Sequence, residues 1–334
     1  AASTTATGRE LLYLAKEKVE DHFEGAEIIY GDTDSIFIYF NPRDEQGNVL
    51  VNKEGLKKTI ELGIEAEKYI QPFLKKPHVL EYEKTFWPFI LFSKKRYIGN
   101  KYEHDVNKYK QTSMGIVLKR RDNADIVKHV YGGVINILMN KKNLGLSIDF
   151  LREELNKLVE GKFPIDMLVI TKSLRGYYKN PNQIAHKVLA DRMGIRDPGN
   201  KPSSNDRIPY VYIEVKENKF SKMLQGDRIE HIDYIRDHGL KPDYNFYITN
   251  QIMKPVTQIY ALIVEKLDGF KYPSDYYSTQ YKLLCKTKEP EKAKKKIEDM
   301  KTKEASNIIF GEITRKATNR KNKSTEITDF FSRK

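Results

Sequence analysis

The pattern of apolar and polar positions predicts a β-hairpin near the start of the chain. Two short runs of residues that favour strands, 27–29 and 36–40, flank the hexapeptide Tyr-Gly-Asp-Thr-Asp-Ser at residues 30–35. Glycine and aspartate favour turns, because glycine tolerates left-handed backbone and aspartate bonds to its own main chain. We therefore expect a hairpin whose tip carries Asp32 and Asp34.

Segments with apolar residues at helical spacing lie on both sides of this hairpin in the sequence. Residues 8–23 and 53–74 each repeat apolar side chains every three or four positions, and the second run should end near Pro72. The polar stretch 42–52 predicts a loop, whereas residues 79–102 are rich in β-branched and aromatic side chains and predict strands. Two helices on one face of an antiparallel sheet predict an α+β domain.

The second half of the chain is predicted to be mainly helical. Helical patterns occur at residues 124–134, 148–159, 183–193 and 243–267, and a strand is expected at 210–215. Asp122 or Asn123 is a candidate cap for the first of these helices, and Pro255 predicts a kink or break in the last. We place the domain boundaries to give units 1–121, 122–285 and 286–334. The last unit is lysine-rich, and we expect a mobile tail with at most transient helix.

Composition narrows the class of protein. The 334 residues are 39% hydrophobic and 31% charged, which fits a globular protein with enough chain for two cores. The net charge of +13 predicts an anionic partner. Cys285 is the single cysteine, which excludes a disulfide framework and a cysteine-rich metal module. No run is apolar enough to span a membrane and no signal peptide is visible, so we expect an intracellular protein.

The two aspartates at the hairpin tip are candidates for metal ligation. Carboxylates crowded at one turn repel each other unless a positive charge lies between them. Mg²⁺ prefers oxygen ligands and would serve this purpose. An isolated Asp-Thr-Asp is more often an ordinary polar turn. The flanking tyrosine, glycine and serine and the two strands favour the metal site here.

The hexapeptide at residues 30–35 resembles motif C of the family B DNA polymerases. Further segments resemble the same family in the same order along the chain, and they are most similar to the delta-type and large-DNA-virus members. The matches extend from Ala1 to about Leu267. They lie at residues 1–9, 80–84, 94–97, 115–123, 168–172, 196–199 and 207–211. The resemblance implies an antiparallel palm sheet with packed helices, followed by a mainly helical thumb. Delta-type members also carry a cysteine-rich module, which this sequence lacks.

The resemblance assigns roles to three carboxylates. The residue that matches Asp34 bridges two Mg²⁺ ions in the family, and the match to Asp32 is a weaker or alternative ligand. One ion activates the primer 3′-hydroxyl, and the other neutralises the triphosphate and the departing pyrophosphate. Glu83 matches a carboxylate close to the metals. The alternative for Glu83 is an ordinary strand glutamate paired with Lys84 or Lys95.

Basic residues form the expected DNA contacts. Side chains alternate along a strand, so Lys95 and Tyr97 should share one face and Lys94 and Arg96 the other. In the family, this Lys-x-Tyr pattern holds the primer terminus. Lys119, Arg120, Arg121 and Lys172 are candidates for phosphate contacts in the thumb. A generic charged surface is the alternative for each of them. The histidines at 78, 104, 129, 186, 231 and 238 show no metal-ligand spacing, and we expect structural or exposed roles.

Other family motifs do not occur in the chain. Motif A supplies the second bridging aspartate, motif B supplies a lysine that meets the triphosphate, and the 3′–5′ exonuclease has motifs of its own. All of them precede the matched region in family order. Since the chain also begins without Met and inside a helical pattern, we expect a fragment, or a processed or split product.

Two functions from different classes fit the sequence. The first is the C-terminal part of a DNA-directed DNA polymerase, active on primer-template DNA and deoxynucleoside triphosphates when joined to its missing N-terminal part. The second is a non-catalytic module that binds duplex DNA and tethers a sliding clamp. Intact Asp32, Asp34, Lys95 and Tyr97 favour the first, because a tether does not need metal carboxylates. For this function, we expect a location in the nucleus or at a cytoplasmic site of viral replication.

The end of the chain resembles a clamp-binding peptide. Residues 324–331 place Ile327 before two adjacent aromatics, Phe330 and Phe331, as a plug for a hydrophobic pocket would require. Glutamine is usual at the first position of such peptides, where this chain has Ser324. The alternative is an apolar cluster without a partner at a disordered end.

Overall fold

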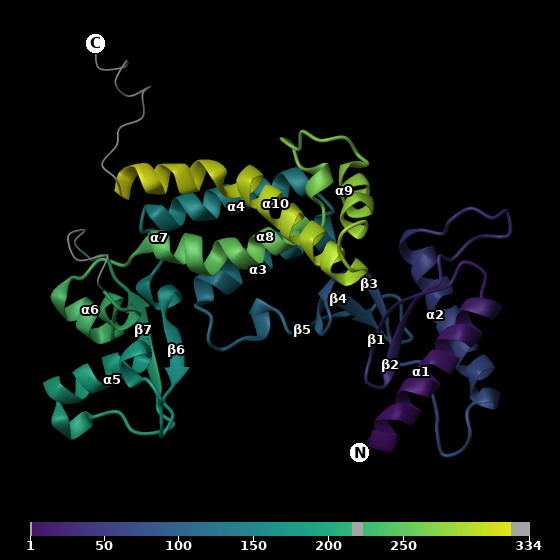
Figure 1. Ribbon diagram of the computed structural model, residues 1–334, viewed down its shortest axis with the longest axis horizontal. Helices are drawn as coiled ribbons and strands as arrows, with labels where there is room; N and C mark the ends of the chain where they lie inside the picture. The colour runs from purple at the N-terminus through teal and green to yellow at the C-terminus, as the bar shows by residue number, and fades with distance from the viewer. Residues whose placement is uncertain (1, 216–222, 322–334) are drawn as a thin grey trace, which may run out of the picture. The chain divides into compact units, whose positions relative to one another are not determined.

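The computed structural model describes residues 2–215 and 223–321 (Figure 1). It divides into two compact units, Ala1–Lys119 and Arg120–Lys334, which we describe separately. The proposed clamp-binding residues Ile327, Phe330 and Phe331 lie outside the described residues. Within the described residues, none of the helices combines the length and the apolar character that a membrane crossing requires.

The first unit alternates helices and antiparallel strands, as an α+β fold requires. Its elements are α1 (Ala2–His22), β1 (Glu27–Asp32), β2 (Ser35–Tyr39), α2 (Asn52–Ile70), a 3₁₀ turn (Gln71–Phe73), β3 (Thr85–Ser93), β4 (Arg96–Tyr102), β5 (Lys110–Met114) and a second 3₁₀ turn (Val117–Lys119). The predicted hairpin and both predicted helices are confirmed. Residues 79–84 are not strand, so the predicted strand region begins too early.

The strands form two sheets rather than the single sheet that we expected. β1 pairs with β2 from Glu27 opposite Tyr39 to Asp32 opposite Ser35, and β3, β4 and β5 form a separate antiparallel sheet. Side-chain packing joins them, because the Phe37 ring lies 5.7 Å from Phe89 and 5.5 Å from Tyr97, measured between centroids. This aromatic contact fixes the hairpin against the three-stranded sheet.

Helices α1 and α2 cover the hairpin with a small apolar core. Ala15, Val19 and Phe23 from the first helical segment and Ala66 and Ile70 from α2 are buried together with Phe40, which follows β2. These residues recur at helical spacing, so each helix presents one apolar stripe to the core. The apolar stripes of the two helices therefore form the core that supports the hairpin.

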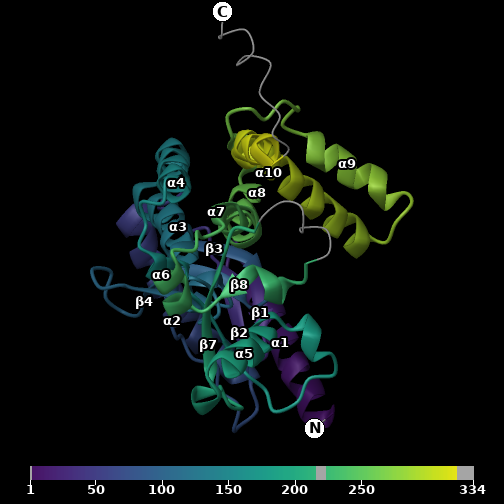
Figure 2. The same ribbon diagram turned by 90° about the vertical axis from the view of Figure 1, so that its left-hand side faces the viewer.

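The second unit is mainly helical, with a small antiparallel sheet in the order β6-β7-β8 (Figures 1 and 2). Its helices and strands are α3 (Asp125–Asn136), α4 (Leu144–Val159), β6 (Ile170–Ser173), α5 (Ala185–Arg196), β7 (Arg207–Tyr212), β8 (Ile229–Glu230), α6 (Ile232–His238), α7 (Tyr244–Phe246), α8 (Met253–Ala261), α9 (Tyr276–Cys285) and α10 (Pro290–Lys321). π-helical segments occupy Ile137–Lys141 and Tyr247–Ile252, and 3₁₀ turns occupy Ile165–Leu168, Pro181–Gln183, Pro198–Asn200, Gln225–Arg228 and Val264–Lys266.

Two local predictions in this unit are corrected. Neither Asp122 nor Asn123 caps α3, whose N-cap residue is Ala124, because the carboxylate of Asp122 is occupied by Arg120 and Lys172. Pro255 does not break its helix. Residues 244–261 are continuously helical, and the segment Tyr247–Ile252 immediately before α8 adopts π-helical turns. The helix is therefore irregular just before the proline, in its π-helical turns, but it is not interrupted.

The prediction of a mobile tail after residue 285 is wrong for the described part. Helix α10 packs against α8 and α9 (Figures 1 and 2). Apolar side chains at roughly helical spacing are buried along it, namely Ala293, Ile297, Ala305, Ile309 and Phe310. The lysines that suggested a solvated tail do not occupy these buried positions. Burial of the apolar stripe therefore stabilises a helix that the lysine-rich composition alone would not predict.

Candidate active site

The tip of the first hairpin places two carboxylates on a two-residue turn. Asp32 and Ser35 form the last pair of the ladder, and the backbone N–H of Asp34 donates to the Asp32 carbonyl at 2.6 Å. The hydroxyl of Ser35 donates to the same carbonyl at 3.2 Å. Thr33 adopts a left-handed backbone with φ of 58°. The turn is therefore held by its own hydrogen bonds as well as by the two strands.

Asp32 is paired with a lysine from the turn between β3 and β4. Its carboxylate accepts a hydrogen bond from Lys95 Nζ at 2.6 Å and one from the Thr33 hydroxyl at 3.1 Å. The Lys95 ammonium lowers the pKa of Asp32 below its ordinary value, and Asp32 in turn raises the pKa of Lys95. Both groups are therefore charged at neutral pH, and a cation already occupies one oxygen of Asp32.

Asp34, in contrast to Asp32, is exposed and unpaired within the described part of the chain. Its side chain forms no hydrogen bond or ion pair there. Its negative charge nevertheless helps to raise the pKa of Lys95, after the larger effect of Asp32. The tip thus carries one carboxylate held by an ammonium and one that is accessible to a ligand.

Lys95 and Tyr97 both lie beside Tyr30, but strand alternation is not what places Lys95 there. Lys95 lies in the turn before β4, with φ of 59°, so the alternation of strand side chains does not apply to it. Its backbone N–H donates to the hydroxyl of Tyr30 at 2.8 Å. Tyr97 lies on β4 with its ring centroid 6.5 Å from that of Tyr30. Burial is the main cause that raises the pKa of the Tyr97 hydroxyl.

Gly115 gives the Lys95 turn its close support. Its φ is +63°, and a Cβ at this position would lie 2.2 Å from the Lys95 carbonyl oxygen. Any other residue would therefore displace the turn. Sequence reasoning missed both Gly115 and Tyr30 as site residues. The signal for Gly115 was its place at the start of the family-like segment 115–123, and the signal for Tyr30 was its place in the hexapeptide.

The other site residues predicted in the first unit are less well defined. The carboxylate of Glu83 pairs with Lys84, as the ordinary alternative expected. It lies near enough to Tyr97 to help raise the pKa of that hydroxyl, after burial and Tyr30. Lys94 is exposed beside Lys95, and Arg96 is half-buried at the start of β4. Within the described residues, no group of three or more His, Cys, Asp or Glu side chains could by itself hold a metal ion.

In the second unit, Asp122 gathers two of the predicted phosphate-binding residues. It accepts hydrogen bonds from Arg120 Nε at 3.0 Å and Nη2 at 2.9 Å, and from Lys172 Nζ at 2.8 Å. The Arg120 guanidinium, followed by Lys172, holds the pKa of the Asp122 carboxyl well below its usual range. Arg120 and Lys172 are thus brought together, 52 positions apart in sequence, by one carboxylate.

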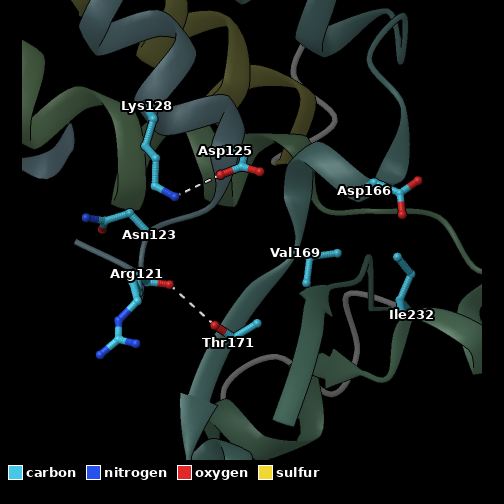
Figure 3. Close-up of a pocket in the computed structure, with 8 residues that line it drawn as sticks. All are labelled: Arg121, Asn123, Asp125, Lys128, Asp166, Val169, Thr171 and Ile232. Carbon is cyan, nitrogen blue, oxygen red and sulfur yellow. Dashed lines mark hydrogen bonds and ion pairs between the residues drawn. The ribbon is translucent and has the colours of Figure 1, made fainter. Parts of the chain in front are cut away.

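The two remaining basic candidates are exposed. Lys119 ends a 3₁₀ turn in the first unit, and Arg121 lies in the second. The Arg121 guanidinium has no hydrogen-bond or ion-pair partner among the described residues. It lines an open cavity of about 400 Å³ with Asn123, Asp125, Lys128, Asp166, Val169, Thr171 and Ile232 (Figure 3). In this cavity Lys128 pairs with Asp125 at 2.8 Å, and the Thr171 hydroxyl donates to the Arg121 carbonyl at 3.3 Å.

Comparison with known proteins decides the family. The model of DNA polymerase family B matches residues 1–263, which is most of the chain. The chain belongs to DNA polymerase family B. The match includes the hairpin tip, the Lys95 turn and the Asp122 cluster, so these features lie in the part that the family shares.

Relatives within family B include viral and cellular enzymes. The chain is 52% identical to the DNA polymerase of Pyramimonas orientalis virus, over 99% of this chain and 27% of that protein. It is 46% identical to the DNA polymerase of Acanthamoeba polyphaga mimivirus, over 79% of this chain and 15% of that protein. The DNA polymerase delta catalytic subunit of Candida albicans is 30% identical, over 79% of this chain and 24% of that subunit. The chain therefore spans about a quarter or less of the length of these relatives.

The fold agrees with a solved structure of the family. The family B DNA polymerase from the archaeon Pyrobaculum calidifontis aligns with a TM-score of 0.54 and 21% identity. The alignment covers 81% of this chain and 30% of that one. This likeness supports the α+β architecture of the chain.

Proposed function

We propose that this chain forms the C-terminal part of the palm and the thumb of a DNA-directed DNA polymerase. It would extend a primer 3′-hydroxyl with deoxynucleoside triphosphates when joined to a part that supplies motif A and the fingers. The observation that carries this proposal is the hairpin tip. Asp32 and Asp34 lie there beside Lys95, in a chain that belongs to family B.

The two carboxylates at the tip fit the part of a two-metal site that this chain would supply. Asp32 already holds a cationic group at 2.6 Å, and the Asp34 oxygens are accessible. Two carboxylates are enough for Mg²⁺, which commonly keeps water and substrate phosphates as its other ligands. Asp34 and Asp32 would hold the ions, together with the motif A aspartate and with Glu83 nearby. The bound ions would activate the primer hydroxyl and neutralise the charge on the triphosphate.

The residues around the tip have separate tasks in this proposal. Lys95 offers an ammonium to minor-groove acceptors or phosphate at the primer terminus, and the ring of Tyr97 packs on a sugar. The neighbouring Lys94 and Arg96 add positive charge on the same turn and strand. Since the aromatic cluster and Gly115 fix the position of the Lys95 turn, this primer grip is largely preorganised.

The basic residues of both units would hold the duplex behind the primer terminus. Arg121 and Lys119 are exposed, and their cations can meet phosphates directly. Arg120 and Lys172 share Asp122 and would contribute a reduced net charge. Such contacts hold duplex DNA without reading its sequence. Ile327, Phe330 and Phe331 would add a tether to a sliding clamp, and the enzyme would act in the nucleus or at a cytoplasmic site of viral replication.

A chimera tests the proposal. The segment of the Pyramimonas orientalis virus DNA polymerase that matches this chain is replaced by this chain, and primer extension is measured with Mg²⁺. The unmodified viral enzyme is the positive control, and this chain alone is expected to be inactive. We expect the chimera to extend the primer. A folded chimera that binds duplex DNA but adds no nucleotide would contradict the proposal and favour the non-catalytic tether.

A further inference from the structure

The Tyr30 hydroxyl lies where the hairpin tip and the β3–β4 turn meet. Tyr30 and Asp32 are two positions apart on β1, so their side chains share one face of the strand. The hydroxyl oxygen accepts a hydrogen bond from the Lys95 backbone N–H at 2.8 Å. It also helps to lower the pKa of the Asp32 carboxyl, after the larger effects of Lys95 and Thr33. The hydroxyl thus bonds to the Lys95 backbone from the strand face that also carries Asp32.

The conformation of Lys95 depends on such a restraint. Its φ of 59° lies in the left-handed region, which a lysine adopts only when its surroundings hold it there. Gly115 contacts the carbonyl side of the residue, and Tyr30 bonds to the amide side. Without the bond from Tyr30, the turn would be free to relax to the favoured negative φ. The ammonium would then leave its place 2.6 Å from Asp32.

We propose that Tyr30 is a positioning residue, whose hydroxyl holds the Lys95 turn so that the ammonium stays beside the carboxylates of the hairpin tip. This inference deepens the proposed function and rests on it, because the ammonium would meet the primer terminus there. Tyr30 acts through Lys95 and does not itself need to touch the substrate.

The Tyr30→Phe variant removes the hydroxyl alone. The ring would keep its contacts with Phe37 and Tyr97, at centroid distances of 5.2 Å and 6.5 Å, so the aromatic cluster stays intact. The freed Lys95 N–H lies in an exposed turn, where water can satisfy it. Tyr39→Phe is the matched control, because Tyr39 is on the same hairpin and its hydroxyl donates to Asn41 at 3.3 Å, away from the tip.

The first experiment measures amide hydrogen exchange on this chain, and does not depend on any enzymatic activity. Loss of one hydrogen bond should speed exchange at the Lys95 amide by about tenfold in Tyr30→Phe. Exchange in the β1–β2 ladder should stay as in the unmodified chain, and Tyr39→Phe should leave Lys95 unchanged. Equal exchange at Lys95 in the variant and the unmodified chain would overturn the proposal. Faster exchange along the whole hairpin would also overturn it, since the role would then be structural.

The second experiment uses the chimera and a double-mutant cycle. Tyr30→Phe should lower the rate of nucleotide incorporation by about tenfold and leave the dissociation constant for duplex DNA within about twofold. In a Lys95→Ala background, the same change should have no further effect. A loss that persists in full without the Lys95 side chain would overturn a role through that ammonium. A chimera with no extension at all would refute the proposed function instead, and the exchange experiment would still decide the positioning role.

Discussion

Replacement of Asp122 by asparagine should destabilise the second unit by a predictable amount. The carboxylate accepts three hydrogen bonds from two cations, and asparagine keeps a similar shape but loses the charge. Hydrogen bonds to charged groups contribute roughly 1.5–3 kcal/mol when buried. The side chains of Arg120 and Lys172 are 63% and 39% exposed, so solvent screening reduces each contribution to well under that range. We expect a loss of about 1–2 kcal/mol in the free energy of unfolding at pH 7.

The pH dependence follows from the lowered pKa of Asp122. A carboxyl whose pKa is lower in the folded state stabilises the protein above its unfolded pKa, roughly 3.9, and this contribution fades as the pH falls. The difference between the unmodified chain and Asp122→Asn should therefore be full at pH 7 and smaller at pH 3.

Urea unfolding followed by circular dichroism measures this difference. Asp125→Asn is the matched control, because among the described residues Asp125 pairs with Lys128 alone, at the surface, and its loss should change the stability by at most about 0.5 kcal/mol. Tryptophan fluorescence follows the unfolding of the first unit separately, since the single tryptophan, Trp87, lies there and not in the unit of Asp122. Equal stability of Asp122→Asn and Asp125→Asn at pH 7, or a difference that grows on acidification, would refute the reasoning.

Three further predictions concern the core, the DNA contacts and the end of the chain. Phe310→Ala should lower the free energy of unfolding by about 3–5 kcal/mol, because the side chain is fully buried, whereas Leu283→Ala on the exposed side of α9 should change it by less than about 0.5 kcal/mol in the same urea experiment. In the chimera, Lys95→Ala should lower the salt slope of duplex binding by about one unit if the ammonium meets a phosphate, as titrations at several salt concentrations would show. A peptide of residues 321–334 should bind a cognate sliding clamp with a dissociation constant of about 1 μM or weaker, and Phe330→Ala with Phe331→Ala should abolish binding.

Local patterns were sufficient for the elements that carry the site. The hairpin follows from two apolar runs around a turn, and α1 and α2 follow from apolar spacing. Each of these signals lies within a short stretch of sequence. The position of Asp32 and Asp34 at the tip could therefore be predicted without the structure.

Features that depend on distant residues could not be predicted in this way. Tyr30 bonds to Lys95 across 65 positions, and Asp122 bonds to Lys172 across 50. The left-handed backbone of Lys95 is set by its neighbours in space, so the strand alternation assumed for Lys95 and Tyr97 does not apply to this residue. Nothing in the local sequence distinguishes these arrangements from ordinary charged surface.

Helix α10 shows how composition can mislead. Lysines dominate the sequence of residues 286–303, and a solvated tail is the usual interpretation of such a run. The buried positions include alanines, which contribute little to an apolar pattern although they allow close helix packing. Lys301 also takes part, since its ammonium pairs with Glu265 at 2.9 Å and lies 4.8 Å from the centre of the Tyr277 ring. Tertiary contacts therefore determine the structure of this segment.

The most direct test of the proposed active site is the rate of single-nucleotide incorporation by the chimera carrying Asp34→Asn. Asp21→Asn, at an exposed position of α1, is the control. We predict that Asp34→Asn lowers the rate by about a thousandfold or more, because the metal ions lose a ligand that stabilises the transition state by several kcal/mol. Binding of duplex DNA should stay within about twofold, since basic groups dominate it. An Asp34→Asn chimera that incorporates nucleotides within about tenfold of the unmodified chimera would contradict the assignment of the hairpin tip as the catalytic centre.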